Sequence, residues 1–214
     1  MLIASYNAKA MGDVLVVIVA TDAANQQVTV KDNVAQILSD DGKLLGYNFI
    51  QASQILPELK QENGQVQLSE ELVAKLNQQI DQAGFDQPLV YDGKPKFVIG
   101  YVEEMKDHPD SDHLHITTVD TGDEKLQIVC GSPNIANHIK VVVAKIGAMM
   151  PDGKIIYPGE LRGVKSNGMI CSGRELRLKN APDRPGCVIL PDDFGQAGDA
   201  FDFERGNHLF SAAD

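Results

Sequence analysis

Apolar and polar positions in the first part of the chain alternate with two different periods. Two β-branched runs, 13–21 and 26–31, are separated by a polar turn and predict a strand hairpin, and a third strand is expected at 44–51. The period then changes, because Ser69 precedes two glutamates and apolar residues at helical spacing as far as Gly84. Residues 1–89 are therefore expected to form a small α+β domain with one capped helix.

The pattern after residue 90 is that of short strands. Apolar runs lie at 97–105, 113–122, 126–131, 140–147 and 186–191, and a stretch with two prolines and a glycine at 87–96 separates them from the first domain. Turn pairs such as Asp152-Gly153 and Pro158-Gly159 punctuate them. Such a pattern is typical of a small closed barrel, the five-stranded Greek-key OB-fold being the obvious candidate. We expect this all-β domain at 90–203, followed by a C-terminal tail at 204–214.

Composition indicates a globular, acidic protein. Of 214 residues, 43% are hydrophobic, and 30 Asp and Glu against 19 Lys and Arg give a net charge of −11. On average this charge repels phosphate, which argues against a protein that coats nucleic acid or anionic lipid. The longest apolar run, 14–20, is too short for a membrane helix, and the N-terminus does not resemble a secretory signal. We therefore expect a cytoplasmic protein that does not bind a membrane.

The distribution of charge changes this picture. Residues 1–95 carry a net charge of −6, residues 96–139 carry −5 and residues 185–214 carry −5, whereas residues 140–184 hold nine cations against four acids, or +5. Phosphate contacts act within a Debye length of roughly 8–10 Å, so a local basic stretch is more informative than the total. A phosphate-binding surface and a loop with internal salt bridges both remain open.

Motifs of familiar enzymes are absent. The Walker, HExxH, GxSxG, SxxK and GxGxxG patterns do not occur, so we expect no catalytic residue and no cofactor. One GxxG, at 195–198, lies among aspartates and is expected to be a turn. The cysteines lack CxxC spacing and are expected to be buried thiols of a reducing compartment; they are Cys130, Cys171 and Cys187.

Residues 108–115 contain three histidines and two aspartates, which are possible ligands for Zn²⁺ or Mn²⁺. Their spacing is poor for a metal, because His108 precedes a proline and the two aspartates suit turn or cap positions. A turn leading into a strand is the favoured interpretation, and no metal is expected. Direct contact of His113 or His115 with RNA is the remaining alternative.

The segment 161–176 mixes glycines, cations and neutral hydrogen-bond donors. Cations supply affinity for phosphate, while hydroxyl and amide groups fix register on ribose and backbone. A glycine-rich connection whose polar groups satisfy one another is the alternative. With two lysines from the neighbouring strand and one histidine, the residues expected to bind RNA are Arg162, Lys165, Ser166, Asn167, Ser172, Arg174, Lys140, Lys145 and His115.

Three ordered motifs resemble those of a known RNA-binding domain. They are HPDSDHL at 108–114, LQIVCGSPN at 126–134 and LRGVKSNGMICSGREL at 161–176. All three closely resemble the tRNA-binding domain of bacterial phenylalanyl-tRNA synthetase β subunits, an OB-fold barrel. The whole chain looks like the YtpR family, described as carrying this domain without a synthetase body. In the first motif, Ser111 stands where the family usually has Ala and His113 where it usually has Lys.

The resemblance implies non-catalytic binding of tRNA, with the barrel recognising the folded shape and backbone. Asn134 is expected to cap a short helix after Pro133. One alternative is an interaction module that docks on a synthetase or on itself as a homodimer. Another is an editing or hydrolytic enzyme acting on charged tRNA, although no nucleophile and base pair is evident. The residues of the N-terminal domain indicate no site and no role.

Overall fold

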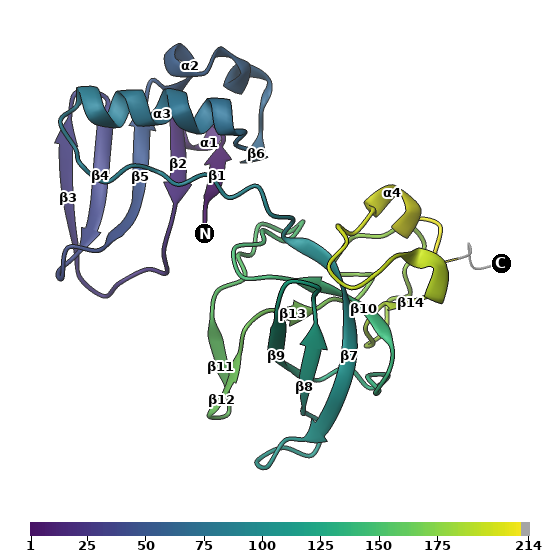
Figure 1. The fold of residues 1–214 in the computed structure, drawn as a ribbon. Coiled ribbons are helices and arrows are strands. Elements are labelled where there is room, and N and C mark those ends of the chain that lie inside the picture. The colour runs from purple at the N-terminus through teal and green to yellow at the C-terminus, as the bar shows by residue number, and fades with distance from the viewer. Residues whose placement is uncertain (211–214) are drawn as a thin grey trace. The chain divides into compact units, whose positions relative to one another are not determined.

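The computed structural model describes residues 1–210, which form two compact units divided between Lys94 and Pro95. Each unit has a hydrophobic core of its own, and Figure 1 shows the elements that enclose it. The sequence places the division at 89/90, within the same Pro- and Gly-containing stretch. Within the described residues, every helix is too short or too polar to cross a bilayer.

The first unit is an antiparallel six-stranded sheet with the order β3-β4-β5-β2-β1-β6. The helix α3 runs across one of its faces (Figure 1). The strands are β1 Ile3–Tyr6, β2 Val14–Ile18, β3 Gln26–Lys31, β4 Val34–Ser39, β5 Leu44–Ile50 and β6 Gly64–Val66. The helical elements are α1 Ala8–Met11, α2 Ala52–Ile55, the 3-10 helix η1 Pro57–Gln61 and α3 Glu70–Gln82.

The predicted helix is confirmed as α3, and its start is the predicted cap. Ser69 Oγ accepts a hydrogen bond from the Leu72 amide at 3.2 Å. Three residues at helical spacing, Val73, Leu76 and Ile80, are buried in the core that also contains Tyr47 and Phe49 of β5. These apolar side chains thus pack α3 against the sheet. The α+β class of this unit is as expected.

The predicted hairpin between 13–21 and 26–31 is wrong. β2 pairs with β1 and β5, while β3 pairs with β4, a strand that the sequence did not reveal. The two runs have similar β-branched composition, but β2 is central, whereas all six residues of β3 are exposed at the edge. Strand propensity reflects a fit to a pleated surface and does not specify the neighbouring strand.

The second unit is an all-β, nearly closed barrel of the OB type. Its main sheet has the order β13-β10-β7-β8-β9, with β14 also on β10, and the β11–β12 hairpin packs against β9. The elements are β7 Phe97–Asp107, β8 His115–Asp120, β9 Lys125–Cys130, β10 Lys140–Ala144, β11 Gly159–Leu161, β12 Val164–Ser166, β13 Met169–Ile170, β14 Ile189–Leu190, η2 Asp192–Phe194 and α4 Phe203–Gly206.

Several local predictions for the barrel can be compared with the structure. The cysteines are free and buried as expected, and burial raises the pKa of the Cys187 thiol to about 11. The prediction that Asn134 caps a short helix is wrong. Its side chain accepts a hydrogen bond from the Cys187 amide at 2.8 Å and donates one to the Cys187 carbonyl at 3.0 Å. The helix α4, Phe203–Gly206, crosses the expected start of the tail at residue 204, and Leu209 and Phe210 pack on the barrel core. Residues 211–214 of the expected tail lie outside the described residues.

Candidate nucleic-acid interface

The β11–β12 hairpin presents two of the expected RNA-binding cations. Leu161 pairs with Val164, which leaves Arg162 and Gly163 as a two-residue turn with φ values of 47° and 80°. Positive φ at both positions is the requirement of a type I′ turn, for which Asn-Gly is preferred. An arginine in this left-handed conformation is unfavourable for the hairpin itself. Its exposed position at the tip therefore suggests a functional reason for the residue.

Backbone and side-chain hydrogen bonds attach this hairpin to the barrel. The Asn167 amide donates to the Gln127 carbonyl, and Gln127 Nε2 donates to the Lys165 carbonyl, both at 2.8 Å. Ser166 is buried, and its Oγ accepts from the Val129 amide at 3.1 Å. Ser166 therefore anchors β12 to β9 with a hydroxyl turned inward, while the next-door Lys165 is exposed.

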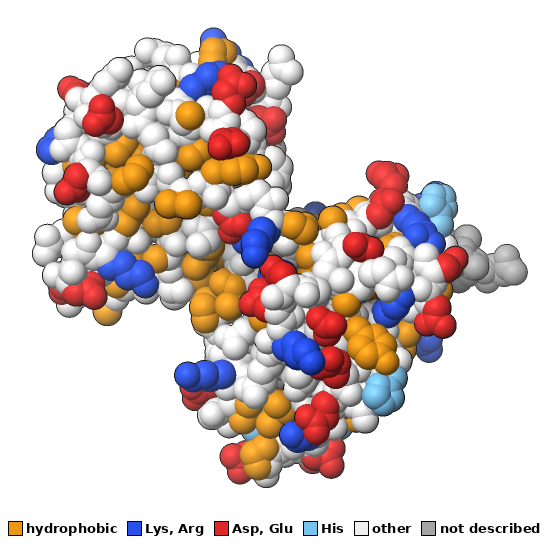
Figure 2. All heavy atoms as spheres, in the orientation of Figure 1, with side chains coloured by type: hydrophobic (Ala, Val, Ile, Leu, Met, Phe, Trp, Pro, Cys, Tyr) orange, Lys and Arg blue, Asp and Glu red, His pale blue; other side chains and the backbone are white. Residues whose placement is uncertain are grey.

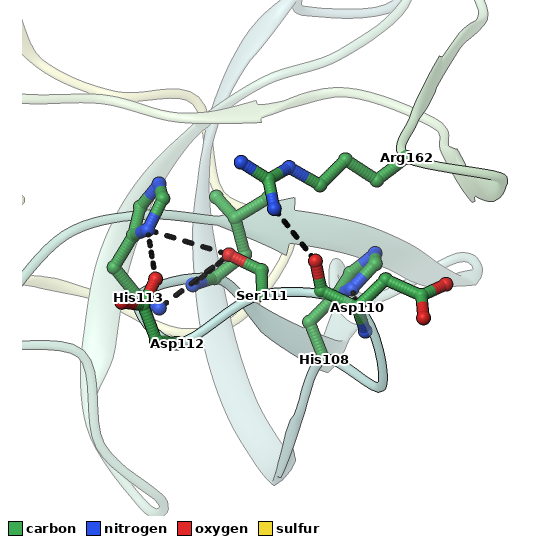
Figure 3. Close-up of polar contacts among 7 residues, drawn as sticks. His108, Asp110, Ser111, Asp112, His113 and Arg162 are labelled. Carbon is green, nitrogen blue, oxygen red and sulfur yellow. Dashed lines mark hydrogen bonds and ion pairs between the residues drawn. The ribbon is translucent and has the colours of Figure 1, made fainter.

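The turn between β7 and β8 is joined to the same hairpin (Figure 3). Arg162 Nη1 donates to the Asp110 carbonyl at 2.6 Å. His108 is buried, its Nδ1 accepts from the Asp110 amide at 3.1 Å, and its Nε2 lies 3.1 Å from the Leu161 carbonyl. Because Nδ1 is an acceptor, Nε2 carries the proton and donates to Leu161. The imidazole of His108 thus joins the two loops, a role that the sequence did not indicate.

The other two histidines of residues 108–115 each lie beside an aspartate. His113 is exposed, and its Nδ1 lies 2.8 Å from Asp112 Oδ1, a contact that lowers the pKa of the Asp112 carboxyl. His115 begins β8, and its Nδ1 lies 3.3 Å from Asp107 Oδ1 without the alignment of a hydrogen bond. Among the described residues, no group of three or more His, Cys, Asp or Glu is placed to hold a metal ion.

Of the two lysines expected in the run 140–147, Lys140 begins β10 and Lys145 follows its last residue, Ala144. Lys140 Nζ donates to the carbonyls of Asp192 and Gly195, each at 2.6 Å. Lys145 Nζ lies 3.0 Å from Asp123 Oδ1 and 2.7 Å from Glu124 Oε1, with 13% of its side chain exposed. Burial lowers the pKa of Lys145, but the two carboxylates outweigh burial and raise it overall. Both ammonium groups therefore have partners within the barrel.

The remaining expected residues lie in the loop after β13. Ser172 Oγ donates to Glu175 Oε2 at 2.7 Å, and Arg174 Nη1 pairs with Asp183 Oδ1 at 2.8 Å. This loop also exposes three cations of the basic stretch 140–184 that were not selected from the sequence: Arg177, Lys179 and Arg184. It borders a pocket of about 230 Å³ to which Asn134, Ser172 and Arg184 contribute.

Two segments of the barrel therefore expose several cations: the β11–β12 hairpin exposes Arg162 and Lys165, and the loop after β13 exposes Arg174, Arg177, Lys179 and Arg184. On the side of the molecule drawn in Figure 2, acidic and basic side chains are interspersed. The net charge of −11 for the whole chain therefore does not represent the local charge of either segment.

Family models match both parts of the chain. Residues 97–199 match a family described as "Putative tRNA binding domain", and residues 21–92 match a "Domain of unknown function (DUF4479)". The "Putative tRNA-binding protein YtpR" of Bacillus subtilis (strain 168) is 44% identical over 203 residues, which are 94% of this chain and 99% of that protein.

Synthetase subunits match the barrel alone. The phenylalanine–tRNA ligase β subunit of Oceanobacillus iheyensis is 46% identical over 58% of this chain but only 16% of that subunit. The corresponding subunit of Sulfurimonas denitrificans is 46% identical over 56% of this chain and 15% of that subunit. The similarity to synthetases thus concerns one domain, whereas the similarity to the Bacillus protein extends over both units.

Proposed function

The chain belongs to the YtpR family, and on that basis we propose that its barrel binds tRNA through folded shape and backbone without catalysing a reaction on it. The β11–β12 hairpin is the observation that carries this proposal. It holds Arg162 at an exposed tip in a backbone conformation that only glycine and a few polar residues adopt readily.

The position of the hairpin supports this proposal. OB barrels bind oligonucleotides on the face of their second and third strands and on the loops that follow the first and fourth strands. Here those strands are β8 and β9, and the two loops contain residues 108–114 and the β11–β12 hairpin. His108 and Arg162 bind these two loops to each other. The backbone of a folded tRNA would therefore contact one surface, on which the two loops are already held together.

The chemistry of the exposed groups fits phosphate better than bases. A guanidinium has five N–H donors, and Arg162 uses one on the Asp110 carbonyl, which leaves others for phosphate oxygens. Lys165 adds a second cation two residues beyond the turn, and the loop after β13 adds a separate basic group. Ser166 and Ser172 are used in internal hydrogen bonds, so in this proposal they position the backbone.

The proposal is tested with the double variant Arg162→Asn, Lys165→Gln. The first change creates the Asn-Gly pair preferred in a type I′ turn, so the hairpin should be retained while two charges are removed. We expect binding of bulk tRNA, followed by fluorescence anisotropy, to weaken about tenfold. The slope of log K against log salt should fall by about two, one for each lost phosphate contact.

The matched control removes two exposed lysines from the first unit with Lys9→Gln and Lys43→Gln, which changes the net charge equally. Equal loss of affinity in both variants would show a general charge effect and contradict the proposed site. Two further measurements test the finer claims. Folded tRNA should compete better than unstructured RNA of equal length, and aminoacyl-tRNA incubated with the protein should lose its amino acid no faster than alone.

A further inference from the structure

The strand β3 is an open edge of the first unit. It lies at the outer side of the six-stranded sheet, and among the described strands only β4 pairs with it (Figure 1). All six of its residues are exposed, including Val28 at 59% and Val30 at 57%. An edge strand presents a row of backbone donors and acceptors that another strand can pair with.

The usual protective features are missing from this edge. Natural edges are blunted by proline, bulges, short length or outward charges. β3 has six residues, contains no proline and pairs with β4 in an unbroken register from Gln26 to Lys31. Its single charged residue, Lys31, is used within the unit: Nζ donates to the Gly84 carbonyl at 2.9 Å and lies 4.5 Å from the centre of the Phe85 ring.

The two valines extend an apolar face. Val28 lies opposite Ile37 and Val30 lies opposite Ala35 on β4, so these four side chains share one face of the sheet. Val34, which shares the other face with Lys31, lies opposite Phe49 in the core beneath α3. The valines therefore point away from the helix, and a further strand beside β3 would cover their exposed sides.

We propose that β3 is a self-association site, where two copies of this chain pair their β3 strands antiparallel and join two six-stranded sheets. An antiparallel pairing about a twofold axis through Thr29 keeps each face continuous. It places Val28 opposite Val30 of the other copy twice, and Thr29 opposite its own counterpart. Lys31 then lies opposite Gln27, so no like charges are opposed. Valine and threonine pairs of this kind stabilise sheets.

The residues of β3 favour a second copy of the chain over a nucleic acid as the partner. The chain has a net charge of −11, and the first unit has six lysines against twelve carboxylates, so two copies repel each other over most of their surfaces. Along β3 this repulsion is absent, because valine, threonine and glutamine would meet there and Lys31 would lie opposite the neutral Gln27. A nucleic acid would need cations that β3 does not offer, since its one lysine is held by Gly84 and Phe85.

Sedimentation velocity of the full chain over a wide concentration range tests this proposal. We expect a concentration-dependent species of twice the 23.2 kDa chain mass. The variant Val28→Lys, Val30→Lys places lysine opposite lysine and should raise the dimer dissociation constant roughly tenfold or more. The variant Val28→Lys, Val30→Glu places opposite charges across the same pairs and should recover much of the dimer. Both positions are exposed, so folding, checked by circular dichroism, should be unchanged.

The matched control is Val90→Lys, at a valine that is 77% exposed elsewhere in the first unit. It should leave the dimer unchanged, and equal weakening by this variant would overturn the proposal. A single-chain mass at every concentration would also overturn it, as would a Val28→Lys, Val30→Lys variant that dimerises as tightly as the wild type. If the lysine–glutamate variant is as monomeric as the double-lysine variant, the Thr29-centred register is wrong.

Discussion

Asp13 shows how a single carboxylate connects three segments of the first unit. Its Oδ1 accepts hydrogen bonds from Tyr6 Oη and from the Ser53 amide, both at 2.9 Å, and its Oδ2 accepts from Ser53 Oγ at 2.7 Å. Partial burial by itself raises the pKa of the Asp13 carboxyl, but these hydrogen bonds favour the ionised form and lower it overall. Asp13 therefore stabilises the fold above the pKa of an unfolded aspartate, and this contribution is lost as pH falls through the lowered value.

Replacement of Asp13 by Ala should lower the free energy of unfolding by about 2 kcal/mol at neutral pH, because hydrogen bonds to a charged acceptor are lost. The difference from the wild type should shrink below about pH 4, where the wild-type carboxyl also becomes protonated. Urea unfolding of both proteins at several pH values measures this. The exposed Asp40→Ala is the control and should change stability little at any pH. A pH-independent difference for Asp13→Ala would contradict the role of its charge.

At the residue scale, the sequence predicted the chemical type of the side chains at the site better than the direction in which they point. Arg162 and Lys165 were selected for their charge and are exposed. Ser166 and Ser172 were selected as donors toward RNA, yet their hydroxyls bond to Val129 and Glu175. A hydroxyl has the same identity whether it faces solvent or core, so only the strand register shows which way it points. Whether any of these residues contacts RNA stays a prediction.

A close approach of two backbone segments sets the packing of the turn between β8 and β9. A Cβ on Gly122 would lie 2.8 Å from the Ala197 carbonyl oxygen and 2.9 Å from Gly198 Cα, and Gly122 has φ of +83°. The Gly198 amide in turn donates to the Ile99 carbonyl at 2.9 Å. The GxxG segment at 195–198 thus contacts this turn and β7, in a structural role.

Gly122→Ala should therefore destabilise the barrel by about 2–3 kcal/mol, because it adds a steric clash to the cost of a positive φ. Gly153→Ala is a matched control, since Gly153 has φ of +91° but no neighbour within 4 Å of the added Cβ. It should cost only about 1 kcal/mol. Thermal unfolding of the two variants gives both values. Equal losses would mean that backbone strain alone explains the effect and that the close approach is unimportant.

At the element scale, several strands were predictable, but the strands that they pair with were not. The runs at 97–105, 113–122 and 126–131 correspond to β7, β8 and β9, because their alternation matches a half-buried strand. The hairpin of β11 and β12 was missed, since β11 is fully exposed and the segment is rich in glycine and charge. Its hydrogen bonds come from β9, which is distant in sequence. Periodicity is local, whereas pairing depends on long-range contacts.

At the scale of the whole molecule, the acidic charge is divided between two units with different cation content. The first unit has no arginine and a net charge of −6, and the remainder has thirteen cations against eighteen acids, or −5. The total of −11 argues against nucleic acid only if charge is averaged over the chain. Because screening limits each phosphate contact to its surroundings, the hairpin and the loop after β13 matter more than the sum.

The barrel alone, residues 95–214, is therefore expected to bind tRNA at least as tightly as the full chain. Removal of the first unit eliminates long-range repulsion from its −6 charge but none of the proposed contacts. Affinity should rise mainly at low salt, and the two proteins should converge as salt is added, because screening removes the repulsion. Titration of both with labelled tRNA at several salt concentrations measures this, with Arg162→Asn, Lys165→Gln in the barrel alone as the control. Weaker binding by the wild-type barrel at low salt would instead show that the first unit contributes contacts to tRNA.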